Sequence, residues 1–353
     1  MFGKTAKLKK NPLVNLKFNQ IKKSSGFDLK VDIKNPSLVS RFTAIIFDQI
    51  VIKGSPDFIK DRLTRAGVKV INNVVDISNY LMITLGQPIH MFDYDKINDK
   101  LMIVRESKKG EKLITLDEKE IILPGGDVVI EDGSGNLIDL CGIMGGLNSA
   151  ISNKTKNVVL FVQTYDKAKI RKTTVATGVR TVASTFFEKG LDAERVEPTL
   201  VYGVELLEKY AQGTVGSKLY DIYPSPIKEK VLDMKYEIFE KKIGVKIPEK
   251  TIELILNNLG FKINHLDNDR EKMVKIIIPS WRTNDVNIPE DVVEEVARVY
   301  GYHNIPSKLQ PAVYVEQPKE MEQIFVFQNK IFQTYRYPFH HQQLRALFFS
   351  LAF

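Results

Sequence analysis

The spacing of apolar residues in the N-terminal half of the chain predicts both strands and helices. Residues 30–33 alternate as a strand does, and residues 42–47 form a β-branched and aromatic run typical of a buried strand. After Pro56, which suits a first helical turn, the apolar residues have helical spacing, and Gly67 suits the end of that helix. This half therefore begins as a mixture of sheet and helix.

The remaining chain continues the mixture. Short strands separated by glycine pairs dominate residues 101–163, and a helix is predicted over about 195–211. A second amphipathic helix is predicted at 249–258, a buried strand at 273–278, and a helix at 291–300 that ends in glycine. The fold class is therefore predicted to be α+β, with several domains and mostly antiparallel sheet.

Composition is that of a globular protein. The chain has 353 residues, 43% of them apolar and 27% charged, which is enough to build more than one domain with a core. A single cysteine, Cys141, excludes a disulfide framework and a multi-thiolate zinc site. With no apolar run long enough to span a bilayer and no leader at the start, a soluble cytoplasmic protein without a membrane partner is expected.

Positive charge is concentrated near the N-terminus. Residues 1–40 hold nine lysines and two aspartates, in a chain whose net charge is +8. Such an arm fits an RNA-facing surface, because neutralising phosphates releases counterions and favours binding. A solvated arm that keeps the chain soluble explains the same charges equally well.

Two segments contain residue types that suit a ligand pocket. Residues 86–93 form a tight bend beside His90, whose imidazole can orient a water or accept a proton. A histidine bonded to backbone within a turn is the alternative. Gly142, Gly145 and Gly146 allow close approach of the backbone to a ligand, or else belong to a packed turn.

Four acidic residues gather near the end of the second half, namely Asp285, Asp291, Glu294 and Glu295. Residues three or four apart share a helix face, so Asp291 can converge with either glutamate, and Asp285 can fold back onto them. Carboxylate oxygens suit magnesium. Helix capping is the alternative, with Asp291 as N-cap and Glu294 completing a capping box.

These segments, taken in order, resemble the beta subunit of bacterial phenylalanyl-tRNA synthetase. The resemblance covers residues 40 to about 308, and the colinearity of the motifs makes it specific although each motif is modest alone. The motifs that carry it are Asn72-Asn73-Val74-Val75-Asp76-Ile77-Ser78-Asn79-Tyr80, Gly86-Gln87-Pro88-Ile89-His90-Met91-Phe92-Asp93, Gly142-Ile143-Met144-Gly145-Gly146, Phe187-Glu188-Lys189-Gly190-Leu191-Asp192, Pro279-Ser280-Trp281-Arg282 and residues 291–302.

The resemblance implies a division into five parts. A basic N-terminal stub would occupy 1–38, an editing-type mixed α/β domain 39–213, and a linker 214–226. A small winged-helix, DNA-binding-like α+β domain with the acidic cluster would follow at 227–308, and a truncated or aberrant start of a catalytic-like domain at 309–353.

The resemblance also implies a function. Members of the family are heterotetramers of two alpha and two beta subunits that join phenylalanine to tRNA-Phe at the cost of ATP. Synthesis takes place on alpha, while beta supports assembly and tRNA binding and hydrolyses wrongly attached tyrosine, as a second sieve. In the family pattern, Asp285, Asp291, Glu294 and Glu295 match carboxylates that hold Mg²⁺ at the alpha–beta contact, which favours the metal interpretation.

The editing pocket departs from the family pattern. The positions that match it are Ser78, Asn79, His90, Gly145 and Gly146. Phe161 stands where the family has a glutamate, followed by Val162 and Gln163 in place of small residues, and Phe186 replaces a usual arginine. Phenylalanine cannot bond the tyrosine hydroxyl, and an unpaired buried hydroxyl costs about 1–3 kcal/mol. Editing of tyrosyl-tRNA is therefore expected to be weak or absent.

Two alternatives remain open at this point. The chain could be a stand-alone tRNA-binding module derived from the editing domain, or a gene fragment without independent activity. The loss of the glutamate at position 161 argues against a hydrolytic module, while the lysine-rich arm supports RNA binding.

Overall fold

The computed structural model describes residues 16–22, 24–266, 273–307 and 318–334. Contacts between residues divide the chain into two compact units, 1–300 and 301–353. Within the first unit, an N-terminal domain contains two five-stranded sheets and a C-terminal domain contains a three-stranded sheet. The α+β prediction is confirmed.

Sheet 1 is the central sheet of the N-terminal domain. Its strand order is β11-β2-β10-β3, and β12 also pairs with β2. The longest strand described, β2, is buried on both faces from residue 41 to residue 47, and the β-branched and aromatic run at 42–47 predicted this burial. The bounds are β2 Val39–Asp48, β3 Ile89–Asp93, β10 Val158–Tyr165, β11 Thr214–Val215 and β12 Tyr220–Ile222.

Sheet 2 faces one side of sheet 1. Its order is β1-β4-β7-β8-β9, in which β1 and β4 are parallel and the other neighbours antiparallel. A separate hairpin is formed by β5 and β6. The bounds are β1 Lys30–Ile33, β4 Leu101–Glu106, β5 Lys112–Ile114, β6 Glu120–Ile122, β7 Val128–Asp132, β8 Leu137–Leu140 and β9 Met144–Gly145.

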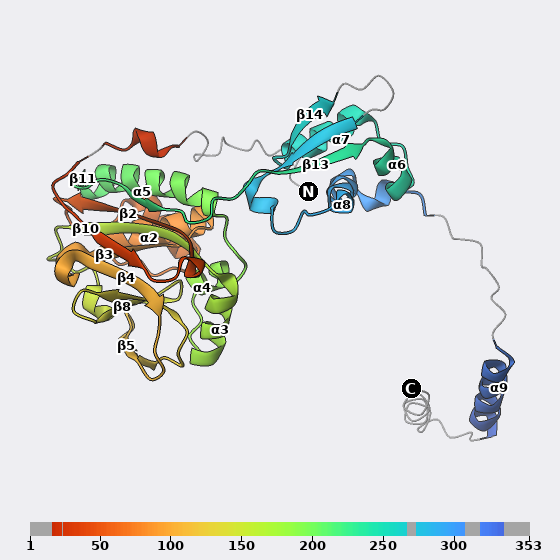
Figure 1. The fold of residues 1–353 in the computed structure, drawn as a ribbon, viewed down its shortest axis with the longest axis horizontal. Coiled ribbons are helices and arrows are strands. Elements are labelled where there is room, and N and C mark those ends of the chain that lie inside the picture. The colour runs from red at the N-terminus through yellow and green to blue at the C-terminus, as the bar shows by residue number, and fades with distance from the viewer. Residues whose placement is uncertain (1–15, 23, 267–272, 308–317, 335–353) are drawn as a thin grey trace. The chain divides into compact units, whose positions relative to one another are not determined.

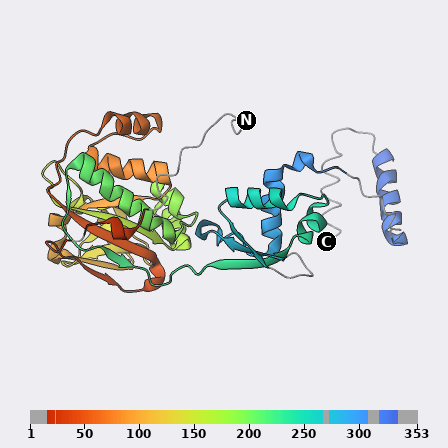
Figure 2. The same ribbon diagram turned by 90° about the horizontal axis from the view of Figure 1, so that it is seen from above.

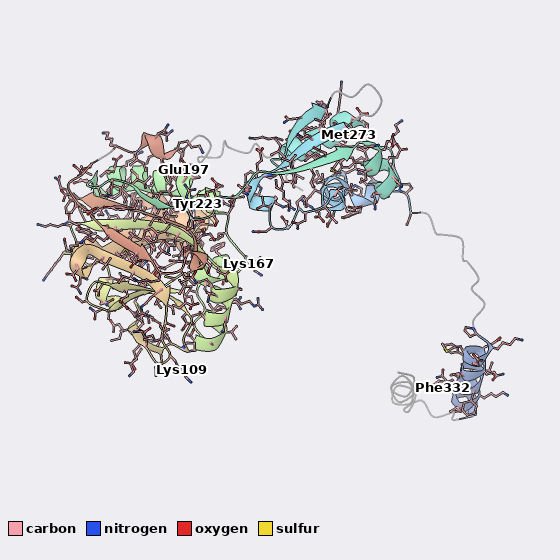
Figure 3. All side chains as sticks on the ribbon, in the orientation of Figure 1. Lys109, Lys167, Glu197, Tyr223, Met273 and Phe332 are labelled. Carbon is pink, nitrogen blue, oxygen red and sulfur yellow. The ribbon has the colours of Figure 1, made fainter. Side chains whose placement is uncertain are left out.

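Three layers make up the N-terminal domain (Figure 1). Helices α1, α2 and α5 cover one face of sheet 1, where Ile45 and Phe47 of β2 join their apolar residues. Phe42 and Ile46 point the other way, into a core shared with sheet 2. The alternation along β2 therefore divides the interior into two cores. Figure 2 shows α2 and α5 side by side, and Figure 3 draws the side chains on the same ribbon.

Local signals determine where the helices of this domain begin and end. The side chain of Asn72 caps α2 by accepting from the backbone N–H groups of Val74 and Val75. Gly86 ends α2 in the left-handed conformation, at a φ of 67° that favours glycine. The bounds are α1 Asp57–Arg65, α2 Asn73–Leu85, α3 Lys167–Thr177, α4 Val182–Phe187 and α5 Val196–Ala211.

Two predicted boundaries differ from the structure. The supposed linker 214–226 contains β11 and β12, which pair with β2 and complete sheet 1. The supposed stub 1–38 contributes β1, which pairs with β4 in sheet 2. Both segments are short and have partner strands far away in sequence, so local pattern alone places them outside the folded domain. The structure makes them part of it.

The C-terminal domain of the first unit packs its helices against an antiparallel sheet of order β13-β15-β14. Its core contains Phe239, Leu256, Ile276 and Val296, and the predicted helix and strand at 249–258 and 273–278 are confirmed. The bounds are β13 Lys230–Lys235, α6 Glu237–Ile243, α7 Glu249–Asn258, β14 Lys262–Leu266, β15 Met273–Ile278 and α8 Pro289–Tyr300.

The second unit is described only in part. It contains the helix α9, Lys319–Thr334, within the segment 309–353 that was predicted to begin a catalytic-like domain. Residues 308–317 and 335–353 lie outside the described residues, so that prediction stays open. Among the helices described, none combines the length and the apolar character needed to cross a membrane.

Candidate functional site: a small polar pocket between the sheets

A small pocket lies where β3 and β10 of sheet 1 meet the β8–β9 turn of sheet 2. Its volume is about 60 Å³. That is room for about two waters, whereas pockets for drug-sized ligands measure about 300–1,000 Å³. Among the residues that line it are His90, Asp139, Met144, Gly145, Gln163 and Phe187.

His90 lies on β3, directly opposite Phe161 of β10. Its ring meets Phe92 edge-on, with the ring centroids 4.4 Å apart, and its buried Nε2 has no hydrogen-bond partner among the described residues. Burial lowers the pKa of His90 to about 4, so the imidazole is neutral at pH 7. His90 therefore lies on a strand and its Nε2 is unpartnered, which differs from the alternative of a histidine in a turn whose ring bonds the backbone.

The glycines bring the two sheets close together. A Cβ on Gly145 would lie 2.6 Å from Nε2 of His90, and one on Gly146 would lie 2.9 Å from the carbonyl oxygen of Ile138. Gly142, at a φ of 69°, is in the turn that precedes β9. The glycine segment is therefore a packed turn, and it is also the wall of the pocket.

Asp139 is the feature that the sequence did not single out. It lies on β8 opposite Gly145, only 4% exposed, and it lines the pocket. Burial raises the pKa of Asp139 to about 8, and the nearby Cys141 thiol opposes that rise. A carboxylate within the otherwise apolar strand 137–140 was the available signal, because buried acids are rare unless they have a role.

Phe161 belongs to the core between the sheets. It is fully buried, with ring centroids 4.8 Å from Phe42 and 5.6 Å from Phe92. Gln163 lies two residues after Phe161 on the same strand and lines the pocket. Its buried Oε1 has no hydrogen-bond partner among the described residues. The side chain that replaces the expected glutamate is therefore apolar and tightly packed, while an amide stands where small residues were expected.

The structure does not bring all predicted pocket residues together. Ser78 and Asn79 lie on α2, which packs on the face of sheet 1 opposite to His90. The hydroxyl of Ser78 donates to the carbonyl of Val75, within the helix. His90 and Gly145 line the pocket, and Gly146 is adjacent to it.

The acidic set is held by arginines. Arg282 donates to both oxygens of Asp285, at 3.1 and 2.9 Å, and to Oε1 of Glu295 at 2.8 Å. Arg298 also donates to Glu295. Hydrogen bonds from Arg282 lower the pKa of Glu295, so this carboxylate is ionised near neutral pH. The guanidinium of Arg282 lies where a cation between Asp285 and Glu295 would be bound.

The other two acids have separate surroundings. Oδ2 of Asp291 accepts from the backbone N–H groups of Asn287 and Ile288 at 2.6 and 3.0 Å, which lowers the pKa of Asp291. Because α8 begins at Pro289, two residues earlier than predicted, Asp291 caps the helix from its first turn. Glu294 is exposed on α8.

The four carboxylates are therefore not arranged as a metal site in this structure. Within the described part of the chain, no group of three or more His, Cys, Asp or Glu side chains is placed to hold a metal ion. The reason is the pairing above: Arg282 neutralises two of the acids, and backbone N–H groups bind a third.

Comparisons with known proteins agree with the two domains. The B3/4 domain family matches residues 38–212, and the tRNA synthetase B5 domain family matches 232–302. The phenylalanine–tRNA ligase beta subunit of Thermotoga maritima is 38% identical over 279 residues, which are 79% of this chain and 34% of that protein. That of Staphylococcus aureus is 36% identical over 296 residues, 82% of this chain and 36% of that protein.

A crystal structure of an N-terminal fragment of the phenylalanyl-tRNA synthetase beta-subunit from Pyrococcus horikoshii has a TM-score of 0.39 and 15% sequence identity, covering 80% of this chain and 77% of that chain. The chain spans about a third of the length of the bacterial beta subunits it matches. The order of the two matched families and the identity to these subunits lead to one assignment. The chain belongs to the phenylalanyl-tRNA synthetase beta-subunit family, as the region made of the B3/4 domain followed by the B5 domain.

Proposed function

We propose that this chain acts as part of the beta subunit of a phenylalanine–tRNA ligase, which forms phenylalanyl-tRNA from phenylalanine, ATP and tRNA-Phe. The observation that supports it most is the succession of a B3/4 and a B5 domain with 38% identity to a beta subunit of that name. Its role is non-catalytic for synthesis. It contributes surfaces for an alpha subunit in a heterotetramer of two alpha and two beta chains, and for tRNA-Phe.

Assembly is tested by co-purification. The chain is co-expressed with the alpha subunit from the same genome, and complexes are isolated in buffer with magnesium or with a chelator. A stable complex that aminoacylates tRNA-Phe is the expected result. A folded chain that forms no complex in either buffer contradicts the proposal.

The magnesium site at the alpha–beta contact is part of the proposal. It rests on the resemblance of Asp285, Asp291, Glu294 and Glu295 to the family pattern. Since Arg282 pairs with two of these acids in this structure, binding of a metal requires those pairs to open. Replacing Asp291 and Glu294 with alanine should lower association with alpha in magnesium more than it lowers the melting temperature of the chain alone. Equal losses would support a capping role only.

We also propose that hydrolysis of tyrosyl-tRNA is weak or absent. Phe161 is buried between Phe42 and Phe92 and offers no polar atom to a substrate hydroxyl. The pocket volume of about 60 Å³ is also far below the roughly 300–1,000 Å³ of pockets that bind drug-sized ligands.

The editing assay uses tyrosyl-tRNA-Phe and the complex of this chain with its alpha partner. The ester should decay at the rate measured in protein-free buffer, within a factor of about two. The same preparation must aminoacylate tRNA-Phe with phenylalanine, which shows that it binds tRNA. A tenfold or greater acceleration of tyrosyl release would refute the proposal.

A further inference from the structure

Every charged residue of helix α3 is positive. The buried side of the helix, which includes Ile170 and Thr173, packs against the domain. Lys167, Arg171 and Lys172 are exposed to solvent. Within the part of the chain that the structure describes, none of these three cations forms an ion pair with an acid. They are therefore available to an anionic ligand.

A further lysine lies beside the first turn of α3. A Cβ on Gly190 would lie 3.1 Å from the side chain of Lys167 (labelled in Figure 3), so Lys189, the residue before this glycine, is next to Lys167. Lys189 is exposed, and no ion pair joins it to an acid among the described residues.

A buried carboxylate joins a second loop to α3. Asp127 accepts hydrogen bonds from the hydroxyls of Thr173 and Ser107, each at 2.7 Å. Lys108 and Lys109 (labelled in Figure 3) directly follow that serine and are exposed. We call the six exposed cations of the helix and its two neighbouring loops the basic face: Lys108, Lys109, Lys167, Arg171, Lys172 and Lys189.

Two acids beside the basic face are already paired. Lys169 of α3 forms an ion pair with Glu106. Arg180 donates to Glu188 at 2.6 Å, and the side chain of Glu188 is only 6% exposed. Asp166, the N-cap of α3, offsets at most one of the six positive charges. The basic face therefore keeps a surplus of positive charge.

The stability of α3 does not explain these charges. Its first turn contains Lys167 and Lys169 and no acid, although the N-terminus of a helix is its positive end and favours acids. Lys167 and Arg171 are four residues apart, a spacing at which like charges repel each other. Cations that oppose both the helix dipole and one another indicate an anionic ligand.

The chemistry of the basic face favours a phosphate backbone over a lipid surface. Lysine and arginine contact nucleic-acid phosphates, and the guanidinium of Arg171 can hold two phosphate oxygens at once. Helices that lie on membranes carry Trp, Phe or Leu beside their cations, and α3 has none of the three. Its largest exposed apolar residue is Val175. The helix thus has charge for phosphates without an apolar stripe for lipid.

We propose that the basic face binds the sugar–phosphate backbone of RNA, and that its ligand in the ligase is tRNA-Phe. This rests on the proposed function and deepens it, because it assigns tRNA contact to α3 and its two neighbouring loops, outside the pocket between the sheets. Backbone contacts position a nucleic acid without reading its bases. Binding should therefore fall steeply with salt, since each neutralised phosphate releases counterions.

The test is fluorescence anisotropy of a fluorescein-labelled tRNA-Phe transcript titrated with the full chain, at KCl concentrations between about 50 and 200 mM. The triple variant Lys167→Gln/Arg171→Gln/Lys172→Gln removes three charges and keeps helix-forming side chains. We expect its affinity at the lowest salt to be lower by about tenfold or more. Its plot of log affinity against log salt should be less steep by about 2–3, from roughly 0.9 per phosphate contact on a duplex.

A second triple variant, Lys53→Gln/Lys69→Gln/Lys209→Gln, is the matched control. These lysines are exposed in the same domain, but they lie beside α1 and on α5, which cover the other face of sheet 1. The control loses the same charge as the α3 variant. It should bind tRNA-Phe within a factor of about three of the unchanged chain, because the charges near the ligand are kept.

The proposal is overturned if the unchanged chain does not bind tRNA-Phe, or if the α3 variant binds it no more weakly than the control does. It is also overturned if vesicles of phosphatidylserine and phosphatidylcholine retain the unchanged chain but not the α3 variant, while that variant binds tRNA-Phe as before. Circular dichroism shows whether each variant is folded. Failure here leaves the ligase function intact, since that function is judged by co-purification with alpha and by aminoacylation at saturating tRNA.

Discussion

Replacing Phe161 by alanine tests whether the position at which the family pattern has a glutamate is part of the core in this chain. Phe161 has no exposed surface, and its ring packs at 4.8 Å from that of Phe42 and 5.6 Å from that of Phe92. Truncating a fully buried phenylalanine removes its burial energy and leaves a cavity, which costs about 3–5 kcal/mol. We expect Phe161→Ala to lower the free energy of unfolding by that amount.

The measurement is urea unfolding followed by far-ultraviolet circular dichroism, with the free energy extrapolated to water. Fluorescence of Trp281, the single tryptophan, shows whether the C-terminal domain of the first unit still unfolds as before. Phe325→Ala is the control, because Phe325 on α9 is 51% exposed and its truncation should change stability by less than about 0.5 kcal/mol.

A loss below about 1 kcal/mol in Phe161→Ala, with an unchanged denaturant slope, would refute the packing argument. It would mean that the ring can leave the core at little cost and that position 161 is free to line the pocket. The prediction of impaired editing would then lose its structural basis. A loss of unfolding free energy in the expected range supports a core role for Phe161 and does not bear on whether the chain hydrolyses tyrosyl-tRNA.

Three further predictions concern protonation, capping and packing. Between pH 6.5 and 8, stability should fall by about 1.4 kcal/mol per unit, because folded Asp139 keeps a proton up to a pKa of about 8 while the unfolded chain has lost it. Asp139→Asn should remove this slope in pH-dependent urea unfolding, and the window begins at 6.5 because His90 contributes an opposite slope below it. Asp291→Ala should lower the melting temperature and Glu294→Ala should not, since only Asp291 accepts hydrogen bonds from the backbone just before α8; equal effects in calorimetry would contradict this. Gly145→Ala places a Cβ 2.6 Å from the ring of His90 and should cost about 1–3 kcal/mol in urea unfolding, whereas no loss would show that the ring moves freely.

Elements with a strong local period were predictable from the sequence. The helix at 249–258 repeats its apolar residues with helical spacing, and the strand at 273–278 is rich in β-branched residues, so both could be recognised without knowledge of their tertiary partners. The short strands at 214–215 and 220–222 have no such period. They form because β2 offers a free edge to them, and that edge comes from residues far away in the chain.

The same limit applies to the site. His90, Gly145 and Gly146 could be selected because an imidazole can orient a water or accept a proton and clustered glycines allow close approach of the backbone, and the structure places them at the pocket or beside it. Asp139 could not be placed there, because only the pairing of β8 with β9 brings it opposite Gly145. The acidic set shows a second limit. Four carboxylates near each other in the sequence predict a bound cation, and in the structure the guanidinium of Arg282 is the cation that pairs with two of them.

The pocket has an acid at position 139 and a phenylalanine at position 161, and this bears on whether a single substitution at 161 could restore the expected site. A glutamate at 161 would lie beside Phe42 and Phe92, where a carboxylate has no partner, and across from His90. Asp139 would still occupy the other wall, and two acids around a cavity of about 60 Å³ repel each other unless one stays protonated. A glutamate placed at 161 is therefore expected to ionise only if the carboxyl at 139 is removed as well, so the single substitution Phe161→Glu should not restore an ionised acid at that position.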